Sequence, residues 1–432
     1  MKPKILTTMA SYSWGQFRAD SLAGVTVALV ALPLSIAIAI ASGAPPKAGL
    51  VTAVIAGFLI SALGGSRVQI GGPTGAFIVV VYAVIHEHGL DGLLVATLMA
   101  GVILLLAGLL GAGRLIRHVP EPVIEGFTIG IAVVIAVSQL KDLAGMTGRG
   151  LPADFIPKLQ ALWALRHSID NPSLLLGLAS VAAILVLRRI APRIPWPVAV
   201  VIAASVVAVS LMPSVDTVSA RYGALPNGLP MPTIPHLSVA LLVELLPVAL
   251  TIAFLAAIES LLSAIVADRM IEGAHRPTAE LIAQGAANIA SPLFGGLPAT
   301  GAIARTATNV NAGGRTPVAG IVHALAILLA MVVAAPLAGM LALPVLAALL
   351  VVTAWTMSEP HRWRERLRLP LADLLLLLGT ALLTVLADLT TAIGAGTIVG
   401  LLLRVSRGEL APARWHTPFR WGGAGRKDRT PD

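Results

Sequence analysis

Two stretches rich in glycine and proline, one in each half of the chain, decide the fold. Residues 71–77 read GGPTGAF and residues 295–303 read GGLPATGAI. Both contain Gly-Gly, then Pro, then Thr-Gly-Ala, and a helical pattern follows each. A short run that we expect to be extended, 68–70 or 292–294, precedes each of them. Because Gly and Pro interrupt a helix, each stretch predicts a segment that is extended in its first half and helical in its second.

The composition around these stretches is that of a membrane protein. The chain has 432 residues, of which 57% are hydrophobic and only 12% are charged, whereas a soluble domain carries about 25% charged residues. Mean hydropathy is +0.89. These values exclude a soluble enzyme. The absence of cysteine excludes disulfides, thiolate metal sites and a cysteine nucleophile.

Hydrophobic stretches suited to crossing a bilayer recur along almost the whole chain. A window of about 20 residues, with shorter spans allowed where a helix is broken, predicts fourteen passes. They are residues 21–41, 48–63, 75–87, 92–112, 122–140, 172–190, 196–212, 238–267, 278–292, 300–311, 317–338, 343–357, 371–387 and 390–404. The two broken spans are the third and the tenth. Since seven is odd, the second set of seven crosses in the opposite sense, which is the pattern of an inverted repeat.

The positive charges orient these spans. With a cytoplasmic N-terminus, 23 of the 30 Lys and Arg residues fall in cytoplasmic segments and six in outer loops, with Arg305 left inside a span. This is the bias that the positive-inside rule predicts for an even number of spans. The net charge of +9 therefore reflects the orientation of the spans in the membrane, and we expect no nucleic-acid partner. A multi-pass protein of a bacterial-type inner membrane, with both termini cytoplasmic, is the predicted location.

The two broken spans predict an anion site. Extended backbone at membrane depth survives only against protein or beside a wet cavity. Each half-helix then directs its N-terminus, with free N–H groups and the positive end of its dipole, toward the middle of the membrane. Two such ends facing each other attract an anion. The alternative is that each Gly-Gly-Pro marks an ordinary kink, but the recurrence of the motif at equivalent places favours the site.

At these residues the chain resembles the SulP family of sulfate permease-like anion transporters. The resemblance runs from about Arg18 to Arg404, nearly the whole chain. The motifs that carry it are DSLAGVTV (20–27), LPLSIA (32–37), APPKAGL (44–50), GGSR (64–67), GPT (72–74), GFTIG (126–130), QGAANI (284–289), GAIARTAT (301–308) and GRTPVAG (314–320).

The resemblance implies an all-α fold of two inverted seven-span repeats, arranged as a core domain and a gate domain. It places the substrate between the third and tenth spans and implies an elevator-like movement of the core against the gate, and a homodimer. We expect a cytoplasmic lead at 1–20, repeats at 21–212 and 238–404, and a short basic tail at 405–432. The tail is too short to hold the C-terminal STAS domain of most family members.

Arg305 is the strongest candidate for the substrate site. An ionisable group inside a span is costly, and this one falls one turn into the second half-helix. A guanidinium matches planar oxyanions bidentately; snorkelling, or an ion pair with Glu259, is the alternative. The predicted substrate-binding residues are Ser35, Ile38, Thr74, Gly75, Ala76, Thr300, Gly301, Ala302, Ala304 and Arg305, with Ser35 and Ile38 included by resemblance. No cofactor is expected.

Glu259 is the candidate for coupling transport to a cation. It lies deep in the eighth span, and Ser263 falls one turn further on the same face. A carboxylate in an apolar span favours its protonated form unless it is paired, so it suits a proton. With Ser263 and backbone carbonyls it would instead ligate Na⁺, which prefers oxygen ligands. A static partner for Arg305 is the remaining alternative.

Three weaker features have plain alternatives. Glu125 faces a core–gate cleft or is simply an acid near a helix N-terminus. His323 is a lone histidine in an apolar helix, for which core packing competes with a proton relay. The run 362–368 (RWRERLR) is typical of a basic linker that touches anionic lipid.

The function that follows is secondary active anion transport coupled to H⁺ or Na⁺, a symport in which sulfate or a related inorganic oxyanion leads. A C4-dicarboxylate such as fumarate, bicarbonate, or a passive anion channel are the alternatives. A nucleobase permease shares the repeat plan but should lack Arg305. An enzyme is excluded because the sequence has no metal-spaced cluster, serine elbow or phosphate loop.

Overall fold

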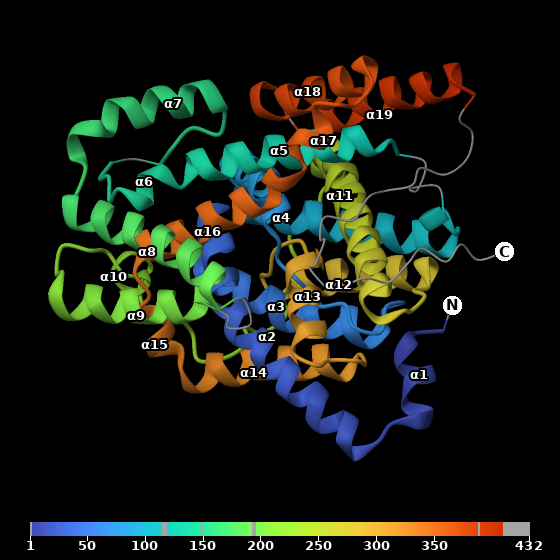
Figure 1. The fold of residues 1–432 in the computed structure, drawn as a ribbon, viewed down its shortest axis with the longest axis horizontal. Coiled ribbons are helices and arrows are strands. Elements are labelled where there is room, and N and C mark those ends of the chain that lie inside the picture. Colours follow the sequence, from blue (N-terminus) through green and yellow to red (C-terminus); the bar gives the residue numbers. More distant parts are fainter. Residues whose placement is uncertain (1, 115–118, 149, 192–195, 388, 409–432) are drawn as a thin grey trace.

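The chain is built almost entirely from helices, with one very short pair of strands. The computed structural model describes residues 2–114, 119–148, 150–191, 196–387 and 389–408 (Figure 1). The first half contains α1 (Lys4–Thr8), η1 (Met9–Ser11), α2 (Trp14–Ala41), α3 (Pro46–Leu63), β1 (Gly71–Gly72), η2 (Gly75–Phe77), α4 (Ile78–Leu109), η3 (Ala112–Arg114), α5 (Glu121–Ser138), α6 (Leu140–Leu143), α7 (Phe155–Ala164), η5 (Leu165–Ser168), α8 (Asn171–Ile190), α9 (Trp196–Leu211) and α10 (Val218–Tyr222). The second half contains α11 (Val239–Ile271), α12 (Pro277–Leu293), β2 (Thr300–Gly301), α13 (Ile303–Asn311), α14 (Val318–Val333), α15 (Ala335–Gly339), α16 (Leu343–Met357), η6 (Pro360–Arg362), α17 (Trp363–Arg366), α18 (Leu371–Leu386) and α19 (Leu389–Ser406).

The predicted spans are confirmed as helices. Seven helices of the described chain are long and apolar enough to cross a membrane, and four shorter apolar helices join them. The long helix α4 contains two predicted passes, because Gly89 breaks it with a φ of 70°. The more polar α12 and the nine-residue α13 complete the set. The chain is therefore the expected all-α, polytopic protein.

The helices pack as two groups, which correspond to the expected core and gate domains. The core consists of α2, α3, α4, α11, α12, α13 and α14, and the gate of α5, α8, α9, α16, α18 and α19. Within the core, α4 packs on α11 and α12, while α14 packs on α2 and α3. Each repeat thus covers the first two spans of the other. In the gate the same exchange pairs α5 with α18 and α8 with α16.

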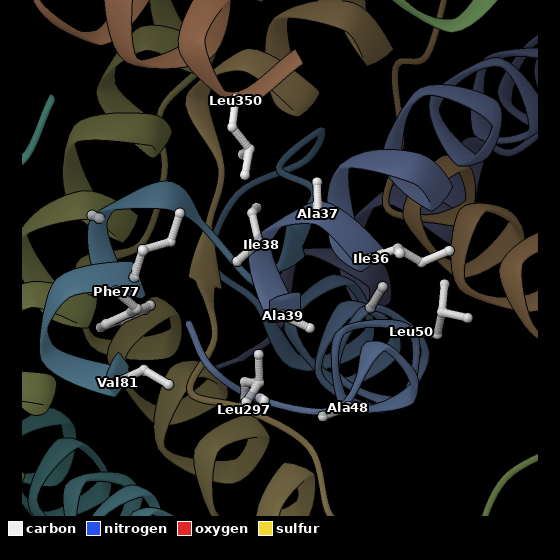
Figure 2. Close-up of a cluster of buried hydrophobic side chains, with 14 of the residues drawn as sticks. Ile36, Ala37, Ile38, Ala39, Ala48, Leu50, Phe77, Val81, Leu297 and Leu350 are labelled. Carbon is white, nitrogen blue, oxygen red and sulfur yellow. The ribbon is translucent and has the colours of Figure 1, made fainter. Parts of the chain in front are cut away.

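Apolar side chains join the start of each repeat to the two broken spans. Figure 2 shows Ile36 to Ala39 of α2 beside Ala48 and Leu50 of α3, with Phe77, Leu297 and Leu350 around them. All of these side chains are buried. Their packing holds the segment that leads into β2 against the helix that leads out of η2, so the two broken spans meet inside the core.

Close helix crossings depend on small residues. A Cβ at Gly49 of α3 would collide with the carbonyl oxygen of Ser35 on α2. At Gly285 of α12 it would fall 2.6 Å from the amide nitrogen of Leu105 on α4. Two helix backbones approach this closely only where no side chain separates them. Membrane helices commonly pack in this way at small residues. The first of these crossings fixes Ser35, a predicted site residue.

Segments that the charge bias assigns to one side of the membrane contact one another. Arg276 donates to the carbonyl of Lys2 (2.7 Å), and the carboxylate of Asp20 accepts from the backbone N–H of Arg315 (2.8 Å). On the other side, Arg221 bonds to Asp142, again joining two loops with the same predicted location.

One local expectation is wrong. The run 292–294 is not extended, because α12 continues to Leu293 and ends in a turn in which Gly296 donates to the Ser291 carbonyl (2.9 Å). Gly295 takes a φ of 73° there, a conformation that favours glycine. The extended stretch therefore begins only after this turn. Of the predicted tail 405–432, residues 409–432 lie outside the described residues.

Candidate functional site

The two broken spans meet through a pair of two-residue strands. β1 and β2 are antiparallel, with Gly71 opposite Gly301 and Gly72 opposite Thr300. The N–H of Ala302 donates to the carbonyl of Ile70 (2.9 Å), which extends the pairing by one bond. Beyond the strands the chain turns into η2 on one side and α13 on the other. This arrangement pairs the backbone of the two breaks with each other and places the starts of two helices beside one cavity.

Neither helix start is capped by its own side chains. Ala302 precedes α13 and offers no side-chain acceptor, and Thr74 precedes η2 without forming a side-chain cap. The first N–H groups of a helix have no partners within the helix and carry its positive dipole end. The α13 start therefore suits a negatively charged group approaching from the cavity.

Arg305 lies in the first turn of α13 with its side chain buried, at 2% exposure. Its Nη2 donates to the Pro73 carbonyl (3.0 Å) and to Ser35 Oγ (3.2 Å). Its Nε and Nη1 have no hydrogen-bond partner among the described residues. The described part of the chain places no carboxylate within 4.0 Å of its nitrogens, so the alternative of an ion pair with Glu259 does not occur in this conformation.

Glycine at position 72 makes room for this guanidinium. A Cβ built there would collide with Nη1 of Arg305, and the residue has a φ of 150°. A side chain would thus meet both a clash and an unfavourable backbone conformation. Gly72 of the first motif therefore leaves the space that the guanidinium of Arg305, in the second motif, occupies.

A cavity of about 240 Å³ opens beside Arg305 between the core and gate helices. Nine predicted residues line it: Ile38, Thr74, Gly75, Ala76, Glu259, Gly301, Ala302, Ala304 and Arg305. Side chains from α5, α16 and α19 form the facing wall, among them Phe127, Thr353 and Ile393. The cavity therefore touches both helix groups, with the groups that suit an anion on the core side.

The other three predicted residues lie behind the cavity wall. Ser35 is fully buried and accepts the bond from Arg305. Thr300 donates to the Ala256 carbonyl (2.8 Å), which ties β2 to α11. Ser263 lies 3.2 Å from Thr306, hydroxyl to hydroxyl. These three residues do not line the cavity, and they bond to residues of the surrounding core helices and backbone.

Glu259 faces the cavity from α11, and the Thr74 hydroxyl donates to its Oε2 (2.9 Å). Its partner is thus the start of the first broken span. Among the described residues Ser263 and Glu259 form no hydrogen bond with each other, although both lie on α11. The carboxylate and the guanidinium consequently occupy separate places on the core wall of the same cavity.

A charged cluster at the other end of the cavity was not predicted as a unit. Arg362 and Arg366, at the α16–α18 connection, bond to Glu121 and Glu125 at the start of α5 and to Glu359. The Arg366–Glu125 pair measures 3.1 Å, and both side chains are buried. Glu125 does line the core–gate cavity, as one of its two interpretations held.

The predicted lipid contact of 362–368 is left to its exposed residues, Trp363, Arg364, Leu367 and Arg368. Arg362 and Arg366 turn inward to carboxylates, while Leu367 is exposed. The sequence feature that could have predicted the cluster is spacing. Glu121 and Glu125 are four residues apart, as are Arg362 and Arg366, and residues at this spacing share a helix face. Across the described residues, no group of three or more His, Asp or Glu side chains is placed to hold a metal ion.

Comparison with known proteins identifies the family. Residues 17–380 match the Sulfate permease family. The chain belongs to this family. Its members transport anions across membranes, so the chain is a multi-pass membrane anion transporter and not an enzyme.

The named relatives and solved structures that the chain resembles match it over most of its length. YvdB of Bacillus subtilis, named provisionally as a sulfate transporter, is 42% identical over 92% of this chain and 75% of its own length. The bicarbonate transporter BicA of Picosynechococcus is 32% identical over 90% of this chain and 70% of its own. The solved transmembrane domain of a cyanobacterial BicA superposes with a TM-score of 0.80, at 32% identity, over 89% of this chain and 99% of that domain. SLC26A9 shares the fold (TM-score 0.85) at 19% identity, over 94% of this chain and 68% of its own.

Proposed function

We propose that this sulfate permease family member is a secondary active anion transporter whose substrate binds at Arg305. The observation that carries the proposal is a buried guanidinium on the wall of a cavity, for which the described part of the chain supplies no carboxylate partner and leaves two nitrogens without hydrogen bonds. An unpaired buried charge costs several kcal/mol. A bound anion offsets that cost through its opposite charge, and the uncapped start of α13 adds to the attraction.

Sulfate or a related inorganic oxyanion is the proposed substrate. Its negative charge complements the Arg305 guanidinium on the cavity wall and the uncapped start of α13. The 42% identity to a relative named for sulfate supports this choice. Bicarbonate is the second candidate, because BicA shares 32% identity over 90% of the chain. A fumarate-like dicarboxylate needs a second cationic partner, and we rank it third.

Coupling to H⁺ or Na⁺ is proposed at Glu259. Its carboxylate lies at the cavity wall and has the Thr74 hydroxyl as a partner. A proton neutralises the carboxylate, whereas Na⁺ takes oxygens from it and from the neighbouring backbone. Either cation removes a negative charge from the cavity that receives the anion. In this scheme the Thr74 bond links the cation to the first broken span, and Ser263 supports the site through Thr306.

Alternating access by movement of the core domain against the gate domain completes the proposal. The cavity is lined by both groups, while the strand pair, Arg305 and Glu259 all belong to the core. A rigid core would carry the whole site past the gate. The charge bias supports cytoplasmic termini, and the charged cluster of Arg362 and Arg366 would then mark the cytoplasmic end of the cavity. A homodimer in a bacterial inner membrane is proposed by family resemblance.

Uptake by purified protein in proteoliposomes tests this function. Radiolabelled sulfate, bicarbonate and fumarate are compared with and without imposed proton or sodium gradients. We expect sulfate to accumulate against its own gradient when a cation gradient is imposed. Flux that only follows the anion gradient under every condition would identify a passive channel. Accumulation of bicarbonate alone would reassign the substrate and leave the site in place.

A further inference from the structure

A carboxylate outside the cavity, Glu280 of α12, is completely buried. Its Oε2 accepts from the backbone N–H groups of Gly65 (2.9 Å) and Ser66 (3.2 Å). Its Oε1 accepts from the Ser260 hydroxyl (2.7 Å) and the Gln284 amide (3.0 Å). Four donors from three separate segments therefore converge on one side chain that does not touch the proposed anion.

Only the ionised carboxylate satisfies all four donors. A carboxylate has about four lone-pair positions and no proton to place. The Ser260 hydroxyl already accepts from the amides of Gln69 (3.1 Å) and Gln284 (2.8 Å), so its own proton must be donated to Glu280. A glutamine at position 280 fails in either orientation. Its NH₂ group would face the two N–H donors of the loop or would crowd a hydroxyl that has no acceptor capacity left.

The same contacts form a closed ring around the proposed coupling site. Gln69, two residues before β1, donates to both the carbonyl and the hydroxyl of Ser260 (3.1 Å each). Ser260 follows Glu259 in α11. From Gln69 the chain runs through β1 to Thr74, whose hydroxyl returns to Glu259. The position of Thr74 relative to Glu259 thus depends on the two hydrogen bonds from Gln69 to Ser260.

We propose that Glu280 is a positioning residue for cation coupling: it holds Ser260 and the 64–66 loop so that Glu259 meets Thr74. Glu280 orients Ser260 Oγ to accept from Gln69, and its other oxygen anchors the loop that leads into β1. The inference rests on the proposed coupling role of Glu259. It assigns to α12 a part in cation dependence, although Glu280 lies outside the cavity lining.

A second buried carboxylate provides the matched control. Asp20 of α2, at 1% exposure, accepts from the N–H groups of Arg315 (2.8 Å) and Thr316 (3.2 Å) and from the Thr316 hydroxyl. It therefore anchors the loop after α13 much as Glu280 anchors the loop before β1. Its hydrogen bonds do not include Ser260, Gln69 or Glu259. Asp20→Asn perturbs a similar structural anchor without entering the ring.

The test measures cation dependence separately from folding. Glu280→Gln, Gln69→Met and Asp20→Asn are reconstituted in proteoliposomes, and anion uptake is titrated with Na⁺ at fixed pH and with pH at fixed Na⁺. We expect Glu280→Gln and Gln69→Met each to shift the half-saturating cation concentration by about tenfold, the effect of one buried donor losing its partner. The double variant should shift it by much less than the product, since both changes open the same ring. Asp20→Asn should remain within about twofold.

Several outcomes would overturn the inference. One is a Glu280→Gln protein with fewer folded molecules but an unchanged cation titration per molecule, which would make it an ordinary structural anchor. Equal shifts in Asp20→Asn would have the same meaning. If Glu280→Gln does not fold, Gln69→Met alone must show the shift, and an unchanged titration refutes the ring. A Glu259→Gln protein with normal cation dependence would instead refute the coupling role itself, which separates the two failures.

Discussion

The two broken spans share a sequence pattern but present different chemistry to the cavity. Aligned on Thr-Gly-Ala, Thr74 corresponds to Thr300 and Val79 corresponds to Arg305. The first span supplies a carbonyl, from Pro73, and the Thr74 hydroxyl. The second supplies the guanidinium. Each half therefore completes the other: the carbonyl and the glycine of the first span hold the charge of the second.

The strand pairing is asymmetric as well. β1 uses the Gly-Gly of the first motif, whereas β2 uses the Thr-Gly of the second. Thr74 consequently lies beyond its strand with a hydroxyl that reaches Glu259, while Thr300 lies within its strand and bonds to the Ala256 carbonyl. An inverted repeat supplies two half-helices, and small differences in register give them different parts: the second carries Arg305, the proposed substrate residue, and the first bonds to Glu259, the proposed coupling residue.

The largest expected effect separates the two half-helices at their corresponding positions. Arg305→Ala should weaken anion uptake at least about 100-fold, because it removes the buried charge that an anion neutralises. Val79→Ala, the matched change in the other half, should leave the anion KM within about threefold. Concentration-dependent uptake in proteoliposomes measures both. Equal losses in the two variants would place the anion midway between the half-helices and remove the special role of Arg305.

Glycine substitutions give the next effect. Gly72→Ala should raise the anion KM about tenfold or more, since the new methyl group pushes against the Arg305 guanidinium. Gly295→Ala is the comparison in the second motif: its φ is 73°, but a Cβ there meets nothing within 4 Å. It should cost about 1–2 kcal/mol of stability by backbone strain alone and keep the KM. Thermal unfolding combined with uptake distinguishes the two, and a normal KM for Gly72→Ala would contradict the contact.

The smallest effect concerns the corresponding threonines. Thr74→Val removes the hydroxyl that donates to Glu259, a hydrogen bond with a net contribution of about 1 kcal/mol. We expect a shift of about five- to tenfold in the cation concentration that half-saturates uptake. Thr300→Val removes a hydroxyl bonded only to a backbone carbonyl and should leave that concentration unchanged. Identical cation titrations for the unmodified protein, Thr74→Val and Thr300→Val would show that Thr74 has no part in cation coupling.

Much of the fold was predictable, because membrane spans are encoded by long apolar runs. The fourteen predicted stretches all contain helices, and the turn inside α4 falls at Gly89, between the third and fourth predicted passes. Arg305 and Glu259 were recognisable because charge is rare and costly at such depths. The inward direction of Arg362 and Arg366 was not predictable, since two of their carboxylate partners, Glu121 and Glu125, are some 240 positions away. The sequence offered only the four-residue spacing within each pair.

The amino-acid sequence by itself determined the number of spans, their inverted arrangement, the two breaks and the identity of the two costly charges. These depend on local quantities, namely hydrophobic length, the backbone preferences of Gly and Pro, and the cost of burying a charge. Only the tertiary structure decided that Glu259 bonds to Thr74 and not to Arg305, that Ser263 bonds to Thr306, and that Glu280 gathers four donors. Those pairings depend on strand register and on the direction of side chains across helices, which long-range packing sets.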